Sequence, residues 1–182
     1  MKLRIVLQKI LKILIFGILY FVANRFVDPL TEFASISFSY SFALLISFSV
    51  IDGPLIGGLS IALGTFLSQV TANRFNWIFI ICSFLDCFLV GYSMNYLDIR
   101  NGFFESKDIT NFNRNQLLSH IACWMIIYPA LAYFNFKEPI IPTMGKGFYI
   151  AFGYFISCLI VSTLSLDIYS RTRVSEANFY RK

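Results

Sequence analysis

Apolar stretches recur along the whole chain, and most of them are about as long as a membrane-spanning helix. A helix needs roughly 20 apolar residues to cross the ~30 Å hydrocarbon layer of a bilayer. Hydrophobic residues make up 57% of the 182 residues and charged residues only 14%, whereas ordinary globular chains have roughly 45–50% and 25%. A soluble core of this size could not bury all these stretches. The pattern therefore predicts an all-α membrane protein that forms one integral membrane domain over residues 1–182.

Polar residues, glycines and prolines divide the apolar stretches into six expected helices. Such residues end or start helices, and they occur at Asp28-Pro29, Asp52-Gly53-Pro54, Asn73-Arg74, the polar segment 98–114, and Glu138-Pro139 with Pro142. We expect transmembrane helices over residues 10–24, 38–51, 54–71, 76–97, 115–135 and 147–167. No small-residue cleavage site follows the first apolar stretch, so we expect a retained helix there rather than a cleaved signal peptide.

Lysine and arginine are distributed unevenly over the expected loops, and this predicts the orientation of the helices. Positive charge is enriched on the cytoplasmic side of membrane proteins. With a cytoplasmic N-terminus, the inner side holds Lys2, Arg4, Lys9, Lys12, Arg100, Lys107, Arg114, Arg171, Arg173, Arg181 and Lys182, and the outer side holds Arg25, Arg74, Lys137 and Lys146. We therefore expect a multi-pass plasma-membrane protein with both termini inside. Because the charge follows topology, we expect no nucleic-acid partner.

One face of the third expected helix consists of small residues. Gly53, Gly57, Ser60, Gly64 and Ser68 follow one another at spacings of four, three, four and four. Helices in lipid gain no hydrophobic free energy from meeting one another, so close contact depends on small residues. This face predicts tight packing against another helix of the same chain, and a dimer seam is the alternative.

A carboxylate and an imidazole lie inside the expected membrane segments. Asp86 falls in the middle of the fourth expected helix, where a charged carboxylate costs on the order of 2.5–3.5 kcal/mol. It must therefore face water, find a partner or stay protonated, and His120 on the fifth helix is a candidate partner. Asp86 is a candidate substrate-binding residue, the alternative being a hydrogen bond between helices. For His120 we favour a structural role.

Polar and aromatic residues also gather at the expected outer ends of the helices. They could line an outward-facing pocket or form the aromatic belt found at membrane surfaces. The group includes Asn24, Gln69, Tyr133, Lys146 and Tyr149. The candidates for substrate binding, expected at the outer ends of helices four to six under the first loop, are Asn73, Arg74, Trp77, Tyr128 and Asn135.

The sequence contains no motif for nucleotide hydrolysis or hydrolase chemistry. Gly145-Lys146-Gly147 lacks the upstream glycine and the following Ser or Thr of a P-loop, and neither HExxH nor GxSxG occurs. The four cysteines form no CxxC pair, and with a single histidine they do not make a zinc ligand set. We therefore expect no enzymatic activity, no cofactor and no metal.

The segment from Ile36 to Gln69, ISFSYSFALLISFSVIDGPLIGGLSIALGTFLSQ, resembles the membrane-embedded S components of energy-coupling factor (ECF) vitamin transporters. In that family an aromatic stretch enters helix two, and a Gly-Pro turn precedes a glycine-rich helix three. The matching residues are Phe38, Tyr40, Gly53, Pro54, Gly57 and Gly64, followed in the order of one subgroup by Asn76-Trp77, Gly91, Glu138-Pro139 and Gly147-Phe148. The likeness covers most of the chain.

Two positions depart from the pattern of that family. Its members commonly carry an AxxxA-like pair in helix one, which docks on the coupling subunit, whereas this chain has Gly17 between Ile13 and Phe21. The acidic residue or histidine that often follows the helix-three glycine is Thr65 here. Both departures concern docking and substrate choice.

The resemblance implies the substrate-binding subunit of an ECF-type importer. Such a subunit captures a vitamin or related micronutrient outside the cell, docks on a transmembrane coupling subunit bearing two cytoplasmic ATPases, and topples to release its substrate inward. Likeness to the subgroup points first to a corrinoid such as cobalamin and next to riboflavin. The family pattern assigns Gly17, Gly53, Gly57 and Gly64 to docking or packing. A structural membrane protein of the MreD type, which organises cell-wall synthesis, is the alternative.

Overall fold

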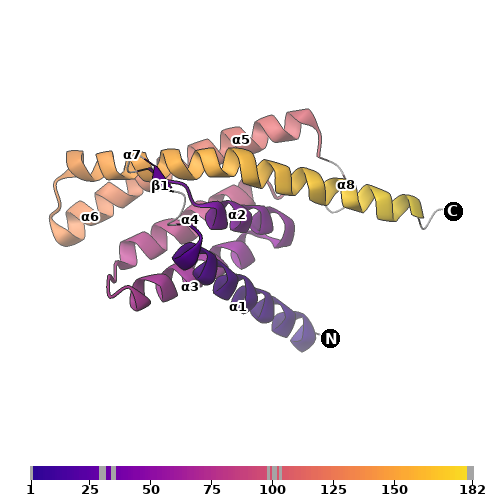
Figure 1. The fold of residues 1–182 in the computed structure, drawn as a ribbon, viewed down its shortest axis with the longest axis horizontal. Coiled ribbons are helices and arrows are strands. Elements are labelled where there is room, and N and C mark those ends of the chain that lie inside the picture. The colour runs from indigo at the N-terminus through magenta and orange to yellow at the C-terminus, as the bar shows by residue number, and fades with distance from the viewer. Residues whose placement is uncertain are drawn as a thin grey trace.

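Helices make up most of the chain, and the described part contains six continuous helical segments (Figure 1). The computed structural model describes residues 2–28, 32–33, 36–97, 99, 102 and 104–179. The predicted all-α class is confirmed. Two segments run on through π-helical turns, from α5 through η3 into α6 and from α7 through η4 into α8. The elements are α1 (Lys2–Phe26), β1 (Glu32–Phe33), β2 (Ile36–Ser37), α2 (Tyr40–Asp52), α3 (Pro54–Thr71), α4 (Trp77–Ser93), α5 (Ser106–His120), η3 (Ile121–Ile127), α6 (Tyr128–Phe136), α7 (Ile140–Ser157), η4 (Cys158–Ser162) and α8 (Thr163–Phe179).

Several of these segments are long enough to cross a bilayer. Among the described residues, four stretches meet the requirements of length and apolar composition: Leu3–Phe26, Pro54–Thr71, Ser106–Phe136 and Ile140–Arg173. The apolar helices α2 and α4 are shorter, with 13 and 17 residues, which corresponds to about 20 and 25 Å of helix. The chain is therefore a multi-pass membrane protein in which two helices are short.

Several helices extend beyond their predicted ends, and for α5 a cap explains the difference. α5 starts at Ser106, inside a segment predicted to be a loop, because Glu105 and Asp108 form a reciprocal capping box. α7 starts at Ile140, and Pro142 lies in its first turn, where the missing backbone N–H costs no hydrogen bond. α1 also begins earlier, and α8 ends later, than the sequence predicted.

The connection between α1 and α2, predicted as a loop, contains two short paired strands of two residues each. β1 pairs with β2 in an antiparallel register that places Glu32 opposite Ser37 and Phe33 opposite Ile36. Ser39 then caps α2, since its hydroxyl accepts a hydrogen bond from the backbone N–H of Phe42 at 3.2 Å. Some residues used in the predictions lie outside the described part of the chain: Pro29, Arg100, Arg181, Lys182 and the side chain of Lys2.

The N- and C-termini lie at the same end of the bundle (Figure 1). The α3–α4 and α6–α7 connections lie at the opposite end, which we call the distal end. α3 packs against α1, α2 and α4, while α7 packs against α2 and η3. The distal end therefore collects segments that are far apart in the sequence.

α3 approaches its neighbours closely because glycines stand where the backbones meet. A Cβ atom added at Gly64 would lie 2.6 Å from the carbonyl oxygen of Gly17 in α1. One added at Gly57 would lie 2.6 Å from the Cα of Ser49 in α2, and Ser49 also fits against Gly91 of α4. The small-residue face of α3 thus lies at helix crossings inside the chain.

The turn between α2 and α3 is tight and is tied to α1. Gly53 has a φ of +111°, which side chains rarely permit, and Pro54 occupies the first helical position, where its missing N–H costs nothing. Lys12 of α1 forms an ion pair with Asp52 at 2.5 Å. The contact fixes α1 against the α2–α3 hairpin at the end of the bundle that carries the termini.

Apolar side chains cover much of the surface, whereas several polar side chains are buried. Leu3 and Ile141 are each 83% exposed, while Asp86 and His120 are 0% exposed. Lipid contact requires this arrangement, because polar groups in hydrocarbon must find partners inside the protein.

Replacing Gly57 by alanine should destabilise the protein. The new methyl group would lie 2.3 Å from the Cβ of Ser49 and 2.6 Å from its Cα, and overpacking of this kind costs about 1–3 kcal/mol. Thermal unfolding in detergent measures the effect. Gly145→Ala is the matched control, because a Cβ there meets nothing within 4 Å. Equal unfolding midpoints for the two variants would contradict the close α2–α3 contact.

Candidate functional site

A cavity of about 250 Å³ lies near the distal end, between α1, α3, α4 and α7. Ligand sites are typically concave and mainly apolar or aromatic, with a few polar groups that orient the ligand. This lining combines aromatic rings with hydroxyl and amide groups: Tyr20, Asn24, Ser39, Thr65, Ser68, Gln69, Phe79, Tyr149, Ile150 and Tyr154. A second cavity between α1 and α2 is lined mainly by apolar side chains and so offers little to orient a polar ligand.

Two hydroxyl groups of α3 face this cavity without a full set of hydrogen bonds. Thr65 is 3% exposed, and its Oγ1 makes no hydrogen bond of normal geometry, although the Tyr20 hydroxyl lies close enough to interact with it. Ser68 Oγ, one turn further along, is buried and has no partner among the described residues. Buried polar groups are nearly always paired, so unpaired ones point to a ligand or an ordered water.

Aromatic rings form one wall of the cavity and are held by further aromatic contacts. Tyr154 of α7 stacks on Phe42 of α2, with ring centroids 4.1 Å apart and planes 25° from parallel. Phe79 of α4 contacts Trp124 of η3 at a centroid distance of 4.7 Å. Tyr149 is 51% exposed and so lies at the mouth. Rings fixed in this way offer a flat surface on which a planar ligand can stack.

A buried aspartate holds the α1–α2 connection beside the cavity. Asp28 is 3% exposed, and its carboxylate accepts hydrogen bonds from the hydroxyls of Ser39 at 2.6 Å and Ser41 at 2.5 Å, and from Asn24 Nδ2 at 3.3 Å. These bonds join the end of α1 to the start of α2, and Asn24 and Ser39 both line the cavity. The sequence indicated only a helix break at Asp28, because the two serines lie 11 and 13 residues away and form no local pattern with it.

Asp86 and His120, the candidate pair inside the membrane segments, are in contact. His120 Nδ1 lies 2.7 Å from Asp86 Oδ2, and the same oxygen accepts a hydrogen bond from Trp124 Nε1 at 2.8 Å. All three side chains are 0% exposed. Two ring nitrogens therefore bond one oxygen of the carboxylate, whereas Oδ1 has no hydrogen-bond partner within the described residues. Asp86 is not among the residues that line the cavity.

Three of the predicted substrate-binding residues lie at the distal surface, outside the cavity lining. Asn73 and Arg74 are exposed in the α3–α4 turn, where Asn73 has a φ of +52°. Asn135 is exposed near the end of α6, and its side chain donates a hydrogen bond to the carbonyl of Leu131 in the same helix at 2.9 Å. The structure does not bring these three residues together with the unpaired hydroxyls.

Trp77 and Tyr128, the other two candidates, lie nearer to the cavity. Trp77 opens α4 and is half-buried against the core. Tyr128 is 8% exposed and meets the Phe79 ring edge-on, with centroids 6.4 Å apart. Tyr128 therefore supports the aromatic wall from outside the lining.

Much of the actual lining was not singled out from the sequence. Asn24, Gln69 and Tyr149 belonged to the predicted outer-end group, whereas Tyr20 and Tyr154 lie within apolar helices, where an aromatic residue facing inward has the same sequence pattern as one facing lipid. Thr65 was noticed only as a departure from a family pattern. Among the described residues, no three His, Cys, Asp or Glu side chains come together as a metal site requires.

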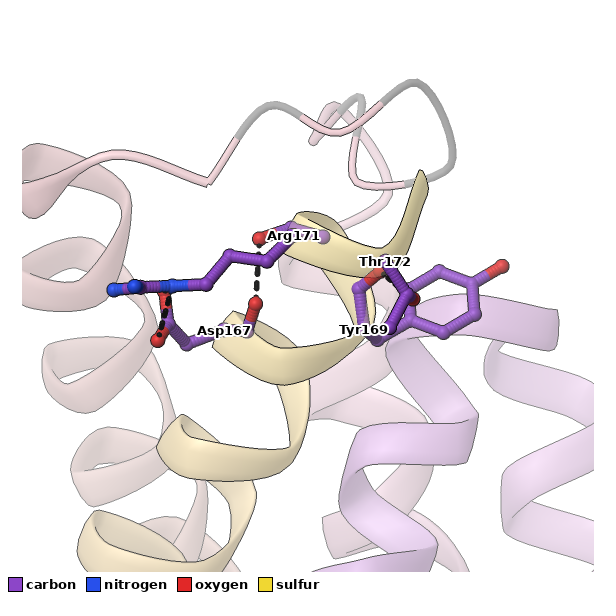
Figure 2. Close-up of polar contacts among 5 residues, drawn as sticks. Asp167, Tyr169, Arg171 and Thr172 are labelled. Carbon is purple, nitrogen blue, oxygen red and sulfur yellow. Dashed lines mark hydrogen bonds and ion pairs between the residues drawn. The ribbon is translucent and has the colours of Figure 1, made fainter. Parts of the chain in front are cut away.

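Asp28→Ala should destabilise the protein more than loss of an exposed ion pair does. The substitution removes the acceptor of three side-chain hydrogen bonds, and bonds to charged groups contribute about 1.5–3 kcal/mol each. Arg171→Ala is the control. Figure 2 shows the Arg171 side chain reaching Asp167 along α8, and Arg171 Nε lies 2.9 Å from Asp167 Oδ2. The Arg171 side chain is 79% exposed. Such exposed pairs contribute about 0–1 kcal/mol. Thermal midpoints in detergent compare the variants, and equal midpoints would show that Asp28 does not hold the connection.

Comparison with known proteins gives one family and a set of relatives. The model of the family described as ECF-type riboflavin transporter, S component, matches residues 5–171. A UPF0397 protein of Enterococcus faecalis is 27% identical over 179 residues, which covers 98% of each chain. A UPF0397 protein of Staphylococcus aureus strain N315 is 27% identical over 164 residues, covering 90% of this chain and 89% of the relative. No solved structure is significantly similar to the chain.

Proposed function

The chain belongs to the family of ECF-type riboflavin transporter S components, and on this basis we propose that it captures a vitamin-sized ligand in the cavity near the distal end. The family consists of membrane-embedded substrate-binding subunits of transporters, not of enzymes. The observation that carries the proposal is the aromatic cavity with two α3 hydroxyls that have free hydrogen-bonding capacity, inside a protein whose surface is largely apolar. A transmembrane coupling subunit and two cytoplasmic ATPases are the proposed partners.

We place the distal end outside the cell and both termini in the cytoplasm. The described basic side chains at the end that carries the termini are all exposed: Arg4, Lys9, Lys12, Lys107, Arg114, Arg171 and Arg173. Fewer lie at the distal end, namely Arg25, Arg74, Lys137 and Lys146. This asymmetry follows the positive-inside rule. In this orientation the cavity faces the medium from which a nutrient is taken up.

A ligand would be held by stacking and by hydrogen bonds from different helices. It enters past Tyr149, which is exposed, and meets the ring of Tyr154 on α7. Thr65 and Ser68 of α3 then offer their hydroxyls, which can donate to a carbonyl or accept from an N–H. These groups come from α7 and α3, and a flat ligand with polar atoms on its edge would use both.

The small size of the cavity counts against a corrinoid, so we propose riboflavin first, the reverse of the order suggested by the sequence resemblance. Pockets for drug-sized ligands measure roughly 300–1,000 Å³, and this one has about 250 Å³. A corrinoid macrocycle with its attached nucleotide is several times larger. The planar ring system of a flavin matches the aromatic wall, and its carbonyl and N–H groups match the two hydroxyls.

Docking on the coupling subunit is proposed for the exposed apolar face of α1. Leu7 and Leu11 of this helix are 65% and 55% exposed. Gly17 faces the other way, because a Cβ there would lie 2.8 Å from the side chain of Leu63 in α3. Gly17, with the α3 glycines, therefore sets how α1 lies on the bundle and serves docking indirectly. Membership of the S-component family favours this role over the structural alternative of the MreD type.

Thr65→Val and Ser68→Ala should each weaken binding of riboflavin to the detergent-purified protein by about 2–10-fold, because a hydrogen bond contributes about 0.5–1.5 kcal/mol. Quenching of flavin fluorescence measures the affinity. Ser93→Ala is the control, since the Ser93 hydroxyl donates to the Val90 carbonyl of its own helix at 2.9 Å. Uptake by cells that also express the coupling subunit and ATPases provides a second measurement.

Two other outcomes would redirect the proposal. If Arg74→Ala and Trp77→Ala abolish uptake while the α3 hydroxyl variants behave as wild type, the distal surface rather than the cavity holds the ligand. If the purified protein carries no small molecule by mass spectrometry, is stabilised by neither riboflavin nor cobalamin, and co-purifies with cell-wall proteins, the structural alternative is correct.

A membrane-impermeant maleimide should label Lys137→Cys in intact cells and should label Lys107→Cys only after lysis. Lys137 follows α6 at the distal end, and Lys107 lies at the start of α5. The wild-type chain serves as the background, because its own cysteines are each 0% exposed: Cys82, Cys87, Cys123 and Cys158. Labelling in the reverse order would place the cavity on the cytoplasmic side and contradict uptake from outside.

A further inference from the structure

The carboxylate of Asp86 contacts two aromatic rings that pack against residues of the cavity lining. Its Oδ2 atom is shared by His120 Nδ1 and Trp124 Nε1. The two donors come from the end of α5 and from η3, whereas Asp86 belongs to α4. Because both bonds converge on one oxygen, rotation of this single side chain would release both rings.

Both rings support residues of the cavity lining. Tyr154 meets Trp124 and His120 edge-on, with centroid distances of 5.6 and 6.3 Å and interplanar angles of 89° and 72°. Trp124 also contacts Phe79. Tyr154 comes from α7 and Phe79 from α4. Because Trp124 contacts both, its position sets the distance between these two sides of the aromatic wall.

The backbone at Trp124 is fixed from the side of α7 as well. A Cβ atom added at Gly147 would lie 1.9 Å from the Trp124 carbonyl oxygen. Tyr154 follows Gly147 by two helical turns and so lies on the same face of α7. Trp124 lies in the π-helical segment η3, and π-helical turns are frequent at functional sites. Its backbone contacts α7, and its indole donates a hydrogen bond to Asp86.

We propose that Asp86 is a positioning residue for ligand capture, which acts through Trp124 and His120 to hold Tyr154 and Phe79 at the spacing the ligand requires. The inference rests on the proposed function, since it concerns the same cavity. Asp86 does not line the cavity, so it acts on the ligand through other side chains. A residue in this role affects affinity even when the aromatic rings are kept.

Trp124→Phe and Asp86→Leu test the role by removing the shared hydrogen bond from either side. Both should lower riboflavin affinity at least tenfold, and both should also lower the thermal midpoint of the ligand-free protein, because each leaves a buried partner without its hydrogen bond. Asp86→Asn keeps an acceptor oxygen for the indole and should recover most of the affinity. Ser83→Ala is the matched control, because Ser83 lies one turn away on α4 and its hydroxyl has no partner within the described residues.

The chain also allows a measurement that needs no ligand. It contains two tryptophans, so Trp77→Phe leaves Trp124 as the sole tryptophan. In that background the time-resolved fluorescence anisotropy of Trp124 should show an immobile ring, and adding Asp86→Leu should introduce a fast component that Ser83→Ala does not. Unchanged anisotropy in the Asp86→Leu protein would overturn the inference whatever the ligand is.

The binding results separate this inference from the proposed function. Wild-type protein that binds no riboflavin and carries no other small molecule contradicts both. Wild-type binding together with undiminished affinity in Trp124→Phe and Asp86→Leu contradicts the positioning role alone. An Asp86→Asn protein as weak as Asp86→Leu would assign the effect to charge instead of to the indole hydrogen bond, and would also overturn it.

Discussion

Close contact between the backbone of α3 and its neighbours is the constraint on which the cavity depends. Helices in lipid are not driven together by burial of apolar surface, so backbone contact at small residues must hold them. A Cβ atom at Gly64 or Gly57 would meet atoms of α1 or α2 at 2.6 Å or less. Because α1 and α2 are held this close to α3, their distal ends stand beside Thr65 and Ser68 and complete the enclosure.

Polar side chains inside the bundle divide into those that join helices and those that remain for other partners. Ser49 and Ser162 each donate to a backbone carbonyl of another helix, at 2.8 and 2.7 Å. Thr65 and Ser68 do not, although their hydroxyl oxygens are also buried. Within the described residues, the other unpaired buried side-chain atoms belong to Ser83, Gln116 and the Asp86–His120 pair. Two of these unpaired groups, Thr65 and Ser68, therefore line the cavity.

Features with a local or periodic signal could be predicted from the sequence, whereas features made by distant side chains could not. The apolar stretches predicted the helical class, and the spacing of small residues located the face of α3 that meets other helices. The Asp86–His120 pairing followed from the cost of a lone carboxylate in lipid. The cavity lining did not follow, because Tyr154 looks like any aromatic residue of an apolar helix. Distal polar residues such as Arg74 were favoured in its place, since exposed polar groups near a membrane surface and pocket residues have the same composition.

The layer around Asp86 also bears on how a captured ligand could leave. Trp124, Asp86 and His120 are each 0% exposed, and both rings are bonded to Asp86. Tyr154 of the cavity lining packs against the two rings. In the proposed orientation the cavity faces outward, so a captured ligand still has to reach the cytoplasmic side. We expect release inside the cell to require reorientation of the whole subunit, or separation of α1 and the α1–α2 connection from the cavity. The S-component family implies an ECF module as the partner that drives such a movement, and the exposed apolar face of α1 is the surface that we propose for this contact.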